Sequence, residues 1–424
     1  MTHAPKTIIE YEILDAKEAK KRTLKGSASQ MDGRVKLTIL DKNKKPRLVH
    51  TQPFGSYVSN FGKILNYLFT GATNVGMKDT SGSATVNANS YAMELNSAAA
   101  NYNTYGIFIG DLRNATGFST FTPAVGIGQT IQLSDYQLYR KLPASGSGVS
   151  PVTDTLYNAT SVTAVGDNVL KVSRTFTCSR SAGVKVSEVG LTAKEKYSAK
   201  LLLLARDFVI SKAGNYVQVA NGETLQVDYI FTITDDSSFT TNFLKILESL
   251  SKASAGASVQ PKTTGASTAL VKFASASTSS FARITSPATA AYGVIVGGTV
   301  NAVPTDSVPI PVVSDYKLNN QVSHANLAHG VTTAISLTAG SGQTKFGVYR
   351  DFTNNGTNNV YINEVGVVAK RSVNHHYLLN RSLLTSGDKP YVVVEPDKTL
   401  RIKVYYVFDI GSVIDLGVST PAVS

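Results

Sequence analysis

The sequence predicts a mainly β protein made of two tandem homologous β-sandwich domains, jelly-roll-like in character, each opening with one helix. Three observations predict this class: an internal repeat, many short apolar segments separated by turns, and a composition rich in Ser, Thr, Ala, Asn and Gly. The chain has 424 residues, of which 42% are hydrophobic and only 17% are charged. That length leaves room for two or three domains with cores of their own.

The internal repeat consists of five segments that return in the same order. Residues 60–68 return as 242–250, 105–110 as 292–297, 133–138 as 313–318, 187–191 as 363–367, and 224–225 as 399–400. A period of about 180 residues is too long for a solenoid unit and fits a duplicated domain. We therefore predict a basic N-terminal arm and hairpin at 1–59, sandwich copies at 60–234 and 242–410, and a C-terminal tail at 411–424.

The N-terminal region has no match in the second copy. Apolar Val35, Leu37 and Ile39 alternate with polar residues, which predicts a strand at 34–40. A turn at 41–46 and a returning strand at 47–52 complete a hairpin, which we expect to dock on a domain or on a neighbour. Residues 10–25 are predicted to form a short charged helix.

Each copy begins with an amphipathic helix. In the first copy Ser59 or Asn60 is the expected N-cap and Gly71 follows the end, while the apolar stripe is formed by Phe61, Ile64, Leu65 and Leu68. The stripe of the second copy is formed by Phe243, Ile246, Leu247 and Leu250. The polar stretches that follow, 69–104 and 251–291, recur at the same place, so we expect surface loops or arms that reach neighbours.

The remainder of each copy has β character. Residues 105–110 and 292–297 are short apolar runs bounded by glycine. The alternation at 217–227 is broken by Asn221-Gly222, which predicts a hairpin, and the matching segment uses residues 395–398 as its turn. Long strands at 225–233 and 400–410 are expected to close the two copies.

Composition excludes several classes of protein. The longest apolar run, 201–205, is far shorter than the roughly 20 residues of a membrane helix, so we expect no membrane span. Residues 1–15 contain no apolar segment typical of a signal peptide, and we expect synthesis in a host cytoplasm. The single cysteine, Cys178, excludes an intramolecular disulfide framework and predicts a small buried side chain.

Positive charge is concentrated near the N-terminus. The net charge is +12, and residues 1–50 contain twelve Lys and Arg against six Asp and Glu. A basic arm can contact nucleic acid or an acidic protein surface. Aromatic residues do not alternate with its Lys and Arg as base stacking requires, so a solvated terminus is the simpler interpretation.

A search for chemistry finds little. The sequence contains no nucleotide-binding loop, no His-Glu-x-x-His and no nucleophile elbow. His375 and His376 are adjacent and would point to opposite faces of a strand, which disfavours a metal site. Residues 351–359 imitate a calcium loop, but Ile362 stands where a bidentate Glu belongs, so an Asn-Gly turn explains them better. We expect no cofactor, no metal and no enzymatic activity.

Two pairs of charged residues recur on strongly apolar strands. Glu188 precedes Arg206 by 18 positions and Glu364 precedes Arg381 by 17, spacings that suit neighbouring antiparallel strands. A catalytic role would need a further acid, base or nucleophile, and none repeats. We predict two equivalent structural salt bridges at hydrogen-bond distance.

These motifs carry a resemblance. The order of 105–110, 133–138, Glu188-Val189-Gly190-Leu191, 203–207 and 220–229 resembles a domain of virion structural proteins of tailed phages and related archaeal viruses. It covers about 130 residues of the first copy and, more weakly, the second, where Asn380 replaces Ala before Arg381 and Asp397-Lys398 replaces Gly-Glu. The resemblance implies a particle component of the head, neck or tail, with no active site to transfer.

Our leading hypothesis is a non-enzymatic structural subunit located in a virus particle, with itself and other virion proteins as partners. Duplicated sandwiches would present two similar bonding surfaces. A receptor- or glycan-binding tail protein is one alternative, and its candidate exposed aromatics are Tyr102, Tyr105, Tyr139, Tyr157 and Tyr361. A cellular surface-array or filament subunit is another, although it would need an export signal. An enzyme that depends on Glu188 or Glu364 is the most distant alternative.

Overall fold

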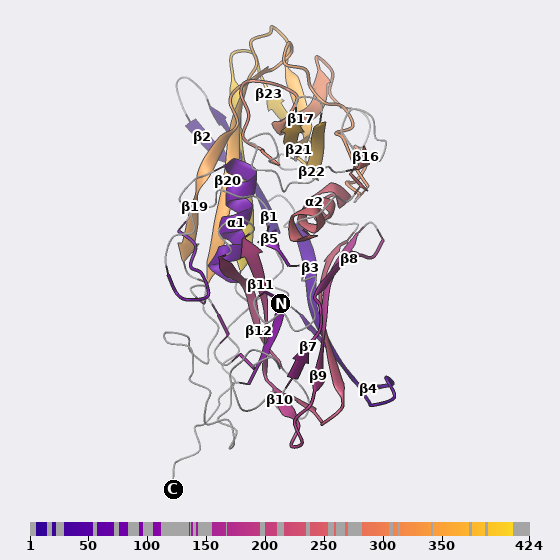
Figure 1. The fold of residues 1–424 in the computed structure, drawn as a ribbon. Coiled ribbons are helices and arrows are strands. Elements are labelled where there is room, and N and C mark those ends of the chain that lie inside the picture. The colour runs from indigo at the N-terminus through magenta and orange to yellow at the C-terminus, as the bar shows by residue number, and fades with distance from the viewer. Residues whose placement is uncertain are drawn as a thin grey trace.

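The chain is mainly β, with several antiparallel sheets and, in the described part, two helices, α1 (Ser59–Thr70) and α2 (Thr241–Lys252) (Figure 1). The computed structural model describes residues 6–14, 19–22, 29–53, 57–71, 76–83, 93–95, 105–111, 135, 137–138, 141–142, 155–166, 168–195, 200–209, 216–234, 238–252, 258–259, 268–269, 282–304, 308–312, 314–340, 342–372, 375–385 and 389–409.

Within the described residues the largest sheet contains twelve strands, all paired antiparallel. Its order is β18-β20-β24-β1-β3-β14-β9-β7, with β19 paired to β20, β2 to β1, β4 to β3 and β8 to β9. The strands are β1 (Lys6–Leu14), β2 (Ala19–Arg22), β3 (Ser29–Leu40), β4 (Pro46–Pro53), β7 (Thr155–Tyr157), β8 (Ser161–Ala164), β9 (Val169–Cys178), β14 (Thr224–Ile233), β18 (Ala328–His329), β19 (Thr333–Gly340), β20 (Gln343–Thr353) and β24 (Thr399–Asp409).

Four smaller sheets accompany it in the part of the chain that the structure describes. In two of them a central strand, β11 or β21, pairs with β12, β5 and β6 or with β22, β17 and β23, and β10-β13 and β15-β16 are two-stranded. The strands are β5 (Met93–Glu94), β6 (Gly106–Gly110), β10 (Val184–Val186), β11 (Glu188–Glu195), β12 (Leu201–Phe208), β13 (Val217–Val219), β15 (Ser258–Val259), β16 (Thr268–Ala269), β17 (Gly293–Val300), β21 (Val360–Ser372), β22 (His375–Leu383) and β23 (Val392–Val394).

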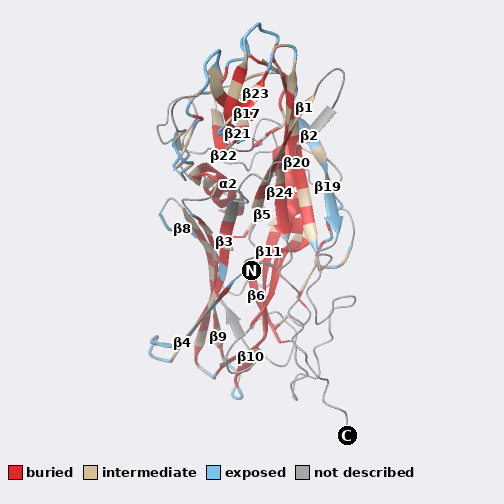
Figure 2. Ribbon diagram, turned by 180° about the vertical axis from the view of Figure 1, so that it is seen from behind, coloured by how far each residue is buried: buried red, intermediate tan, exposed pale blue. Residues whose placement is uncertain are grey.

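The sheets pack in sandwich-like layers. Strands of the large sheet, such as β9, alternate buried and half-buried residues, so one face of each points into a core. Strand β12 is buried along nearly its whole length because it is covered on both faces. Figure 2 shows the buried residues along the central strands and the exposed ones at the two ends of the molecule and on β19.

We call β3, β4 and β5–β14 the first half and β1, β2 and β17–β24 the second half. Strand β1 pairs with β24, β3 pairs with β14, and β1 meets β3 only at Lys6–Gln30 and Thr7–Ser29. The large sheet therefore runs through both halves. Because β1 and β3 are antiparallel, the halves extend in opposite directions from this junction, which gives an elongated molecule (Figure 1).

Both N-terminal hairpins belong to the sheet. The predicted hairpin is confirmed as β3 and β4 with a turn at 41–45, but the predicted helix at 10–25 is wrong. Burial of Thr7, Ile9 and Tyr11 has the period of a strand, and β1 and β2 form a hairpin there. Leu14 lies opposite Thr399 as Leu40 lies opposite Thr224, so β1 and β3, which both belong to residues 1–59, occupy equivalent places beside β24 and β14.

The helices link the two halves. Helix α1 packs on β12 of the first half and on β19 and β20 of the second, while α2 packs on β22 of the second half and on β8 and β9 of the first. The ring of Phe61 lies 5.3 Å from that of Phe408, and Phe69 lies 6.4 Å from Phe346. Helix α2 also packs on β5 of the first half, so each helix contacts sheets of both halves.

The helix prediction is largely confirmed. The stripe residues of α1 are buried, and Gly71 ends the helix with a φ of 74°. The N-cap prediction is wrong, because Val58 occupies that position without a side-chain cap and Asn60 instead bonds the backbone of Lys78. Phe243, Ile246 and Leu247 of α2 are buried, and the side chain of Leu250 lies outside the described residues, as do most of the two polar stretches.

The Asn-Gly prediction is half right. A turn does form, with Gly222 at a φ of 80° and its N–H donating to the Cys178 carbonyl. It does not form a hairpin, because β13 pairs with β10 while β14 pairs with β3 and β9. The turn at 395–398 joins β23 and β24, which also lie in different sheets. The strands on either side of each turn carry inward-facing apolar residues, so the two strands lie in sheets that face each other.

Candidate functional site

Both predicted ion pairs are present. The Nε atom of Arg206 lies 2.9 Å from Oε2 of Glu188, and that of Arg381 lies 2.8 Å from Oε2 of Glu364. Strands β11 and β12, like β21 and β22, are antiparallel neighbours, which brings the charged residues close on one face. The Glu188 and Arg206 side chains are fully buried.

A third residue completes each pair, and the sequence analysis missed it. Nη1 of Arg206 lies 2.8 Å from Oδ2 of Asp135, and Nη1 of Arg381 lies 2.8 Å from Oδ2 of Asp315. We call each set of Glu, Arg and Asp an ion triad. The signal was available, because Ser-Asp-Tyr is repeated at 134–136 and 314–316.

The triad of the second half fastens a surface segment to the sheet. Oε1 of Glu364 accepts the N–H of Asn320 at 2.9 Å, Oδ2 of Asp315 accepts that of Val312 at 3.0 Å, and Arg381 donates to the Pro309 carbonyl at 3.1 Å. Burial lowers the pKa of Arg381, but its bonds to Asp315 and Glu364 outweigh this and raise it above the ordinary value. The charges and hydrogen-bonding groups of this triad therefore hold the segment against the sheet.

The glycine of the Glu-Val-Gly motif makes room for this segment. A Cβ atom on Gly190 would lie 2.6 Å from Cδ2 of Leu138, and one on Gly366 would lie 2.9 Å from Cδ2 of Leu318. These distances are shorter than real carbon contacts allow. The two repeated motifs, Glu-Val-Gly and Ser-Asp-Tyr-x-Leu, therefore interlock in each half.

A second buried arginine in each half bridges the layers. Nη1 of Arg174 donates to the Ile107 carbonyl at 2.9 Å and to that of Tyr105 at 3.1 Å. Nη1 of Arg350 donates at 2.6 Å and 3.1 Å to the carbonyls of Val294 and Tyr292, the matching residues of β17 and the loop before it. Burial lowers the pKa of Arg350 to about 10. Each arginine donates hydrogen bonds to carbonyl groups of the facing sheet that would otherwise be buried without a partner.

The two sequence features that resemble metal sites, the histidine pair and residues 351–359, make other contacts in the structure. The ring of His376 stacks on Tyr292 at 5.4 Å, whereas that of His375 lies 6.4 Å from Tyr377. In the segment that resembles a calcium loop, Asp351 binds Arg401 at 2.7 Å. The Asn354 side chain closes the turn through Gly356, Asn358 and Val394. No group of three or more residues suited to hold a metal ion occurs in the part of the chain that the structure describes.

Of the five aromatic residues proposed for glycan recognition, the structure describes the side chains of two, and neither is fully exposed. Tyr105 is buried, and Tyr361 is half-buried in β21 against Tyr391, with ring centres 5.3 Å apart. Tyr102, Tyr139 and the side chain of Tyr157 lie outside the described residues. Cys178 is buried, as predicted.

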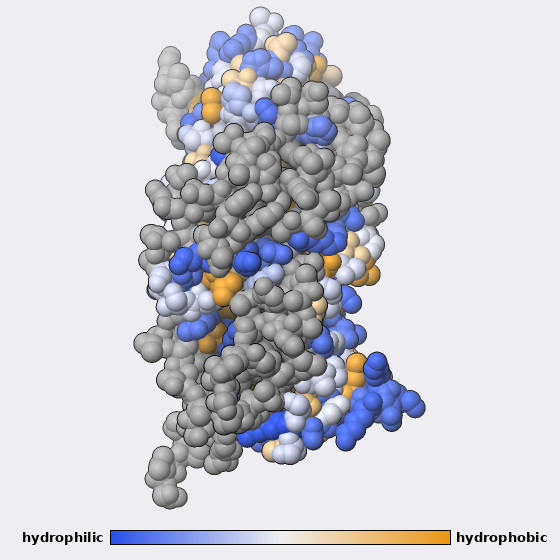
Figure 3. All heavy atoms as spheres, in the orientation of Figure 1, coloured by the Kyte–Doolittle hydropathy of each residue, from blue (hydrophilic) through white to orange (hydrophobic). Residues whose placement is uncertain are grey.

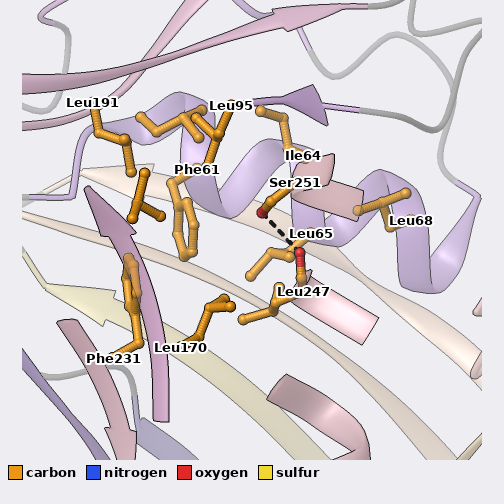
Figure 4. Close-up of a pocket in the computed structure, with 12 residues that line it drawn as sticks. Phe61, Ile64, Leu65, Leu68, Leu95, Leu170, Leu191, Phe231, Leu247 and Ser251 are labelled. Atoms are coloured by element: carbon orange, nitrogen blue, oxygen red, sulfur yellow. Dashed lines mark hydrogen bonds between the residues drawn. The ribbon is translucent and has the colours of Figure 1, made fainter. Parts of the chain in front are cut away.

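An apolar cavity of about 40 Å³ lies between α1, α2 and the sheets (Figure 4). It is lined by Phe61, Ile64, Leu65, Leu68, Leu95, Leu170, Val172, Leu191, Leu204, Phe231, Leu247 and Ser251. The Ser251 hydroxyl donates to the Leu247 carbonyl at 2.7 Å, so it is satisfied within its own helix. The cavity is a packing defect where elements of both halves meet.

A polar pocket of about 280 Å³ opens beside the ion triad of the second half, and Lys317, Asn319 and Arg381 are among its lining residues. Asp315 is 19% exposed there, whereas Asp135 of the first half is 2% exposed. The pocket therefore gives water access to the triad of the second half.

No helix in the described ranges is long and apolar enough to cross a membrane. Comparison of the chain with known protein families, with curated proteins and with solved structures found no match.

Proposed function

We propose that this chain is a non-enzymatic structural subunit of a virus particle, located at the head surface, neck or tail, and assembled through protein–protein interfaces. The motifs that resemble phage virion proteins support the proposal, because they do architectural work here. Glu188, Gly190 and Arg206 contact Asp135 and Leu138 of the repeated Ser-Asp-Tyr-x-Leu motif. Residues that make such contacts serve the packing of the fold, as expected of a structural subunit.

We infer further that the chain is a tandem duplication of a jelly-roll-like sandwich with one helix per copy. The observation that carries this inference is the agreement of contacts at matching positions. Arg174 and Arg350 bond matching carbonyls, Thr177 meets Thr224 as Thr353 meets Thr399, and the N–H of Val58 bonds Leu204 as that of Thr240 bonds Leu379. Such agreement in hydrogen bonding supports common descent of the two halves.

A duplicated, interlocked body suits a subunit of an ordered array. Two related halves that point in opposite directions present similar surfaces at opposite ends, so one chain can do the work of a symmetric dimer. Its partners would be further copies of itself and other virion proteins.

Sedimentation velocity and negative-stain microscopy of the purified protein test the proposal. We expect mass to rise with concentration and ordered rings, tubes or shells to form. Monomers at every concentration, or a hydrolase activity lost on Glu188→Gln or Glu364→Gln in folded protein, would overturn it.

A further inference from the structure

The polar pocket of about 280 Å³ beside the ion triad of the second half has no role in the packing described above. Its lining residues are Pro309, Ser314, Asp315, Tyr316, Lys317, Leu318, Asn319 and Arg381. The volume lies near the lower end of the range for ligand pockets, roughly 300–1,000 Å³. The pocket therefore has room for one small molecule about the size of a single sugar ring.

The carboxylate of Asp315 keeps one oxygen available to this pocket. Its two bonds, from the N–H of Val312 at 3.0 Å and from Nη1 of Arg381 at 2.8 Å, both reach Oδ2. Oδ1 accepts no hydrogen bond from the described residues. Since Asp315 lines the pocket and is 19% exposed, Oδ1 can accept a hydrogen bond from a ligand. The matching Asp135 of the first half is 2% exposed, so its carboxylate is closed to a ligand.

Hydrogen-bond donors lie beside this acceptor. Arg381 uses three of its five N–H groups in the bonds described above. Lys317 and Asn319 are exposed at the pocket, and their side chains form no hydrogen bond or ion pair within the described part of the chain. A hydroxyl group both donates and accepts, so it can use the acceptor and the donors of this pocket together.

Tyr316 adds an apolar surface to the pocket. It is half-buried, and the ammonium group of Lys317 lies 5.6 Å from the centre of its ring. The face of an aromatic ring is a suitable contact for the C–H groups of a sugar. Figure 3 shows hydrophilic and apolar residues intermixed at the end of the molecule where β17 and β23 lie, and Ile310, next to Pro309, is 75% exposed. A ligand that carries both hydroxyl and C–H groups matches this surroundings.

The charges around the pocket cancel. Arg381 and Lys317 each carry one positive charge, and Glu364 and Asp315 each carry one negative charge. A free anion such as phosphate would be repelled by the carboxylate of Asp315, and a metal cation would be repelled by Arg381 and Lys317. A neutral molecule with several hydroxyl groups meets neither repulsion.

We propose that this pocket binds one neutral sugar residue. A hydroxyl group of the sugar donates to Oδ1 of Asp315, Lys317 and Asn319 donate to hydroxyl oxygens, and the ring lies against Tyr316. The site goes beyond the proposed function and does not depend on it, since a subunit can bind a sugar whether or not it assembles. Because a single sugar makes few contacts, its dissociation constant should be on the order of 1 mM.

Saturation-transfer NMR with the methyl glycosides of glucose, galactose, mannose and N-acetylglucosamine tests the site, and we expect saturable binding of at least one. Lys317→Ala/Asn319→Ala should weaken it about tenfold or more, since both side chains are exposed and serve no contact of the fold. In Asp315→Asn the bonds at Oδ2 require the amide oxygen there, so the amide nitrogen replaces Oδ1 and binding should be lost. Gln137→Ala, at the position of the first half that matches Lys317, should bind like the wild type.

Circular dichroism shows that each variant is folded. Binding that both pocket variants lose and Gln137→Ala keeps supports the site. Oligosaccharides of the same sugar then identify its source: tighter binding than that of the methyl glycoside indicates a polysaccharide, equal binding indicates a free sugar, and either supports the site. No binding of any glycoside, binding that the pocket variants retain, or binding of inorganic phosphate in place of the glycosides overturns it. These outcomes leave the proposed function standing, whereas a wild type that stays monomeric overturns that function and not this site.

Discussion

Arg206 and Arg381 each bind two carboxylates, but water reaches the two sites differently. Asp135 is 2% exposed and Asp315 is 19% exposed at the mouth of the polar pocket. A guanidinium that loses a fully buried partner keeps an uncompensated charge, whereas one near water can be solvated. The two halves therefore provide a matched pair for measuring what burial adds.

We expect Asp135→Asn to lower the free energy of unfolding by about 3–5 kcal/mol, the usual cost of breaking a buried ion pair. Asp315→Asn should cost less, about 1–3 kcal/mol, because the pocket admits water. Guanidinium chloride unfolding of both variants gives the comparison. An equal or larger loss for Asp315→Asn would show that exposure at the pocket is not what distinguishes the triads.

We expect Lys141 to make the stability of the folded protein depend on pH. Burial, with Arg174 nearby, lowers its pKa to about 7, and its ammonium lies 3.7 Å from the centre of the Phe108 ring. The unfolded chain keeps a pKa of about 10.4, so the unfolded state binds more protons between about pH 7 and about pH 10. The free energy of unfolding should rise with pH across that window, and the full cost of burying the charge applies below it.

Lys141→Gln, which installs the residue found at the matching position 321, should therefore be more stable than the wild type near pH 6. Its advantage should shrink towards about pH 10. Urea unfolding across this range checks the slope, with Lys78→Gln at an exposed position as the control. An advantage that stays constant with pH would contradict the lowered pKa.

At the residue scale, the sequence showed Glu188–Arg206 and Glu364–Arg381 because both partners repeat on apolar strands at similar spacings. Asp135 and Asp315 were not recognised as partners, because a carboxylate on a surface segment contacts a distant strand only after the segment folds over it. Arg174 and Arg350 bind backbone carbonyls, which leave no trace in residue identity. The pairings of two side chains that both repeat on apolar strands could be predicted, whereas the pairings with Asp135 and Asp315 and with backbone carbonyls could not.

At the scale of elements, local patterns identified strands and helices but not their partners. The stripe of α1 and its terminal Gly71 were visible, since both depend on residues within a few turns. The Asn221-Gly222 signal specifies a chain reversal, and whether the strands on either side pair depends on distant strands. The many charged residues at 10–25 suggested a helix. The alternating burial of β1 arises only because β24 pairs with it, and the sequence of 10–25 does not show that pairing.

Gly62 marks the closest approach of α1 to the second half. A Cβ atom there would lie 2.4 Å from Cγ2 of Thr344 on β20. Gly→Ala in a free helix stabilises by about 1 kcal/mol, but here we expect a loss of about 1–3 kcal/mol from overpacking. Thermal unfolding measures the sign. Thr344→Ser removes the methyl group, so it should recover part of the loss in the double variant; a stabilising Gly62→Ala would show that the helix does not pack this closely.

At the scale of the whole molecule, the repeat predicted two related bodies but not their interlocking. The first strand of the chain completes the second half, the third completes the first, and each helix spans both. No sequence pattern separates a helix that packs on its own domain from one that also covers the next. Two independent sandwiches would have satisfied the same motifs.

Interlocking predicts that the protein unfolds as one unit. Since neither half can lose its strands without exposing the faces that α1 and α2 cover, calorimetry should give one transition with equal calorimetric and van't Hoff enthalpies. Leu247→Ala in α2, which enlarges the shared cavity, should shift that transition as a whole, with a loss of about 2–5 kcal/mol. Two resolved transitions would show that the halves are independent.

A cryo-electron-microscopy reconstruction of the purified protein in low salt tests most directly whether this chain is a self-assembling structural subunit. We expect an ordered oligomer in which both halves contact neighbouring copies. Isolated single chains at every concentration would contradict it.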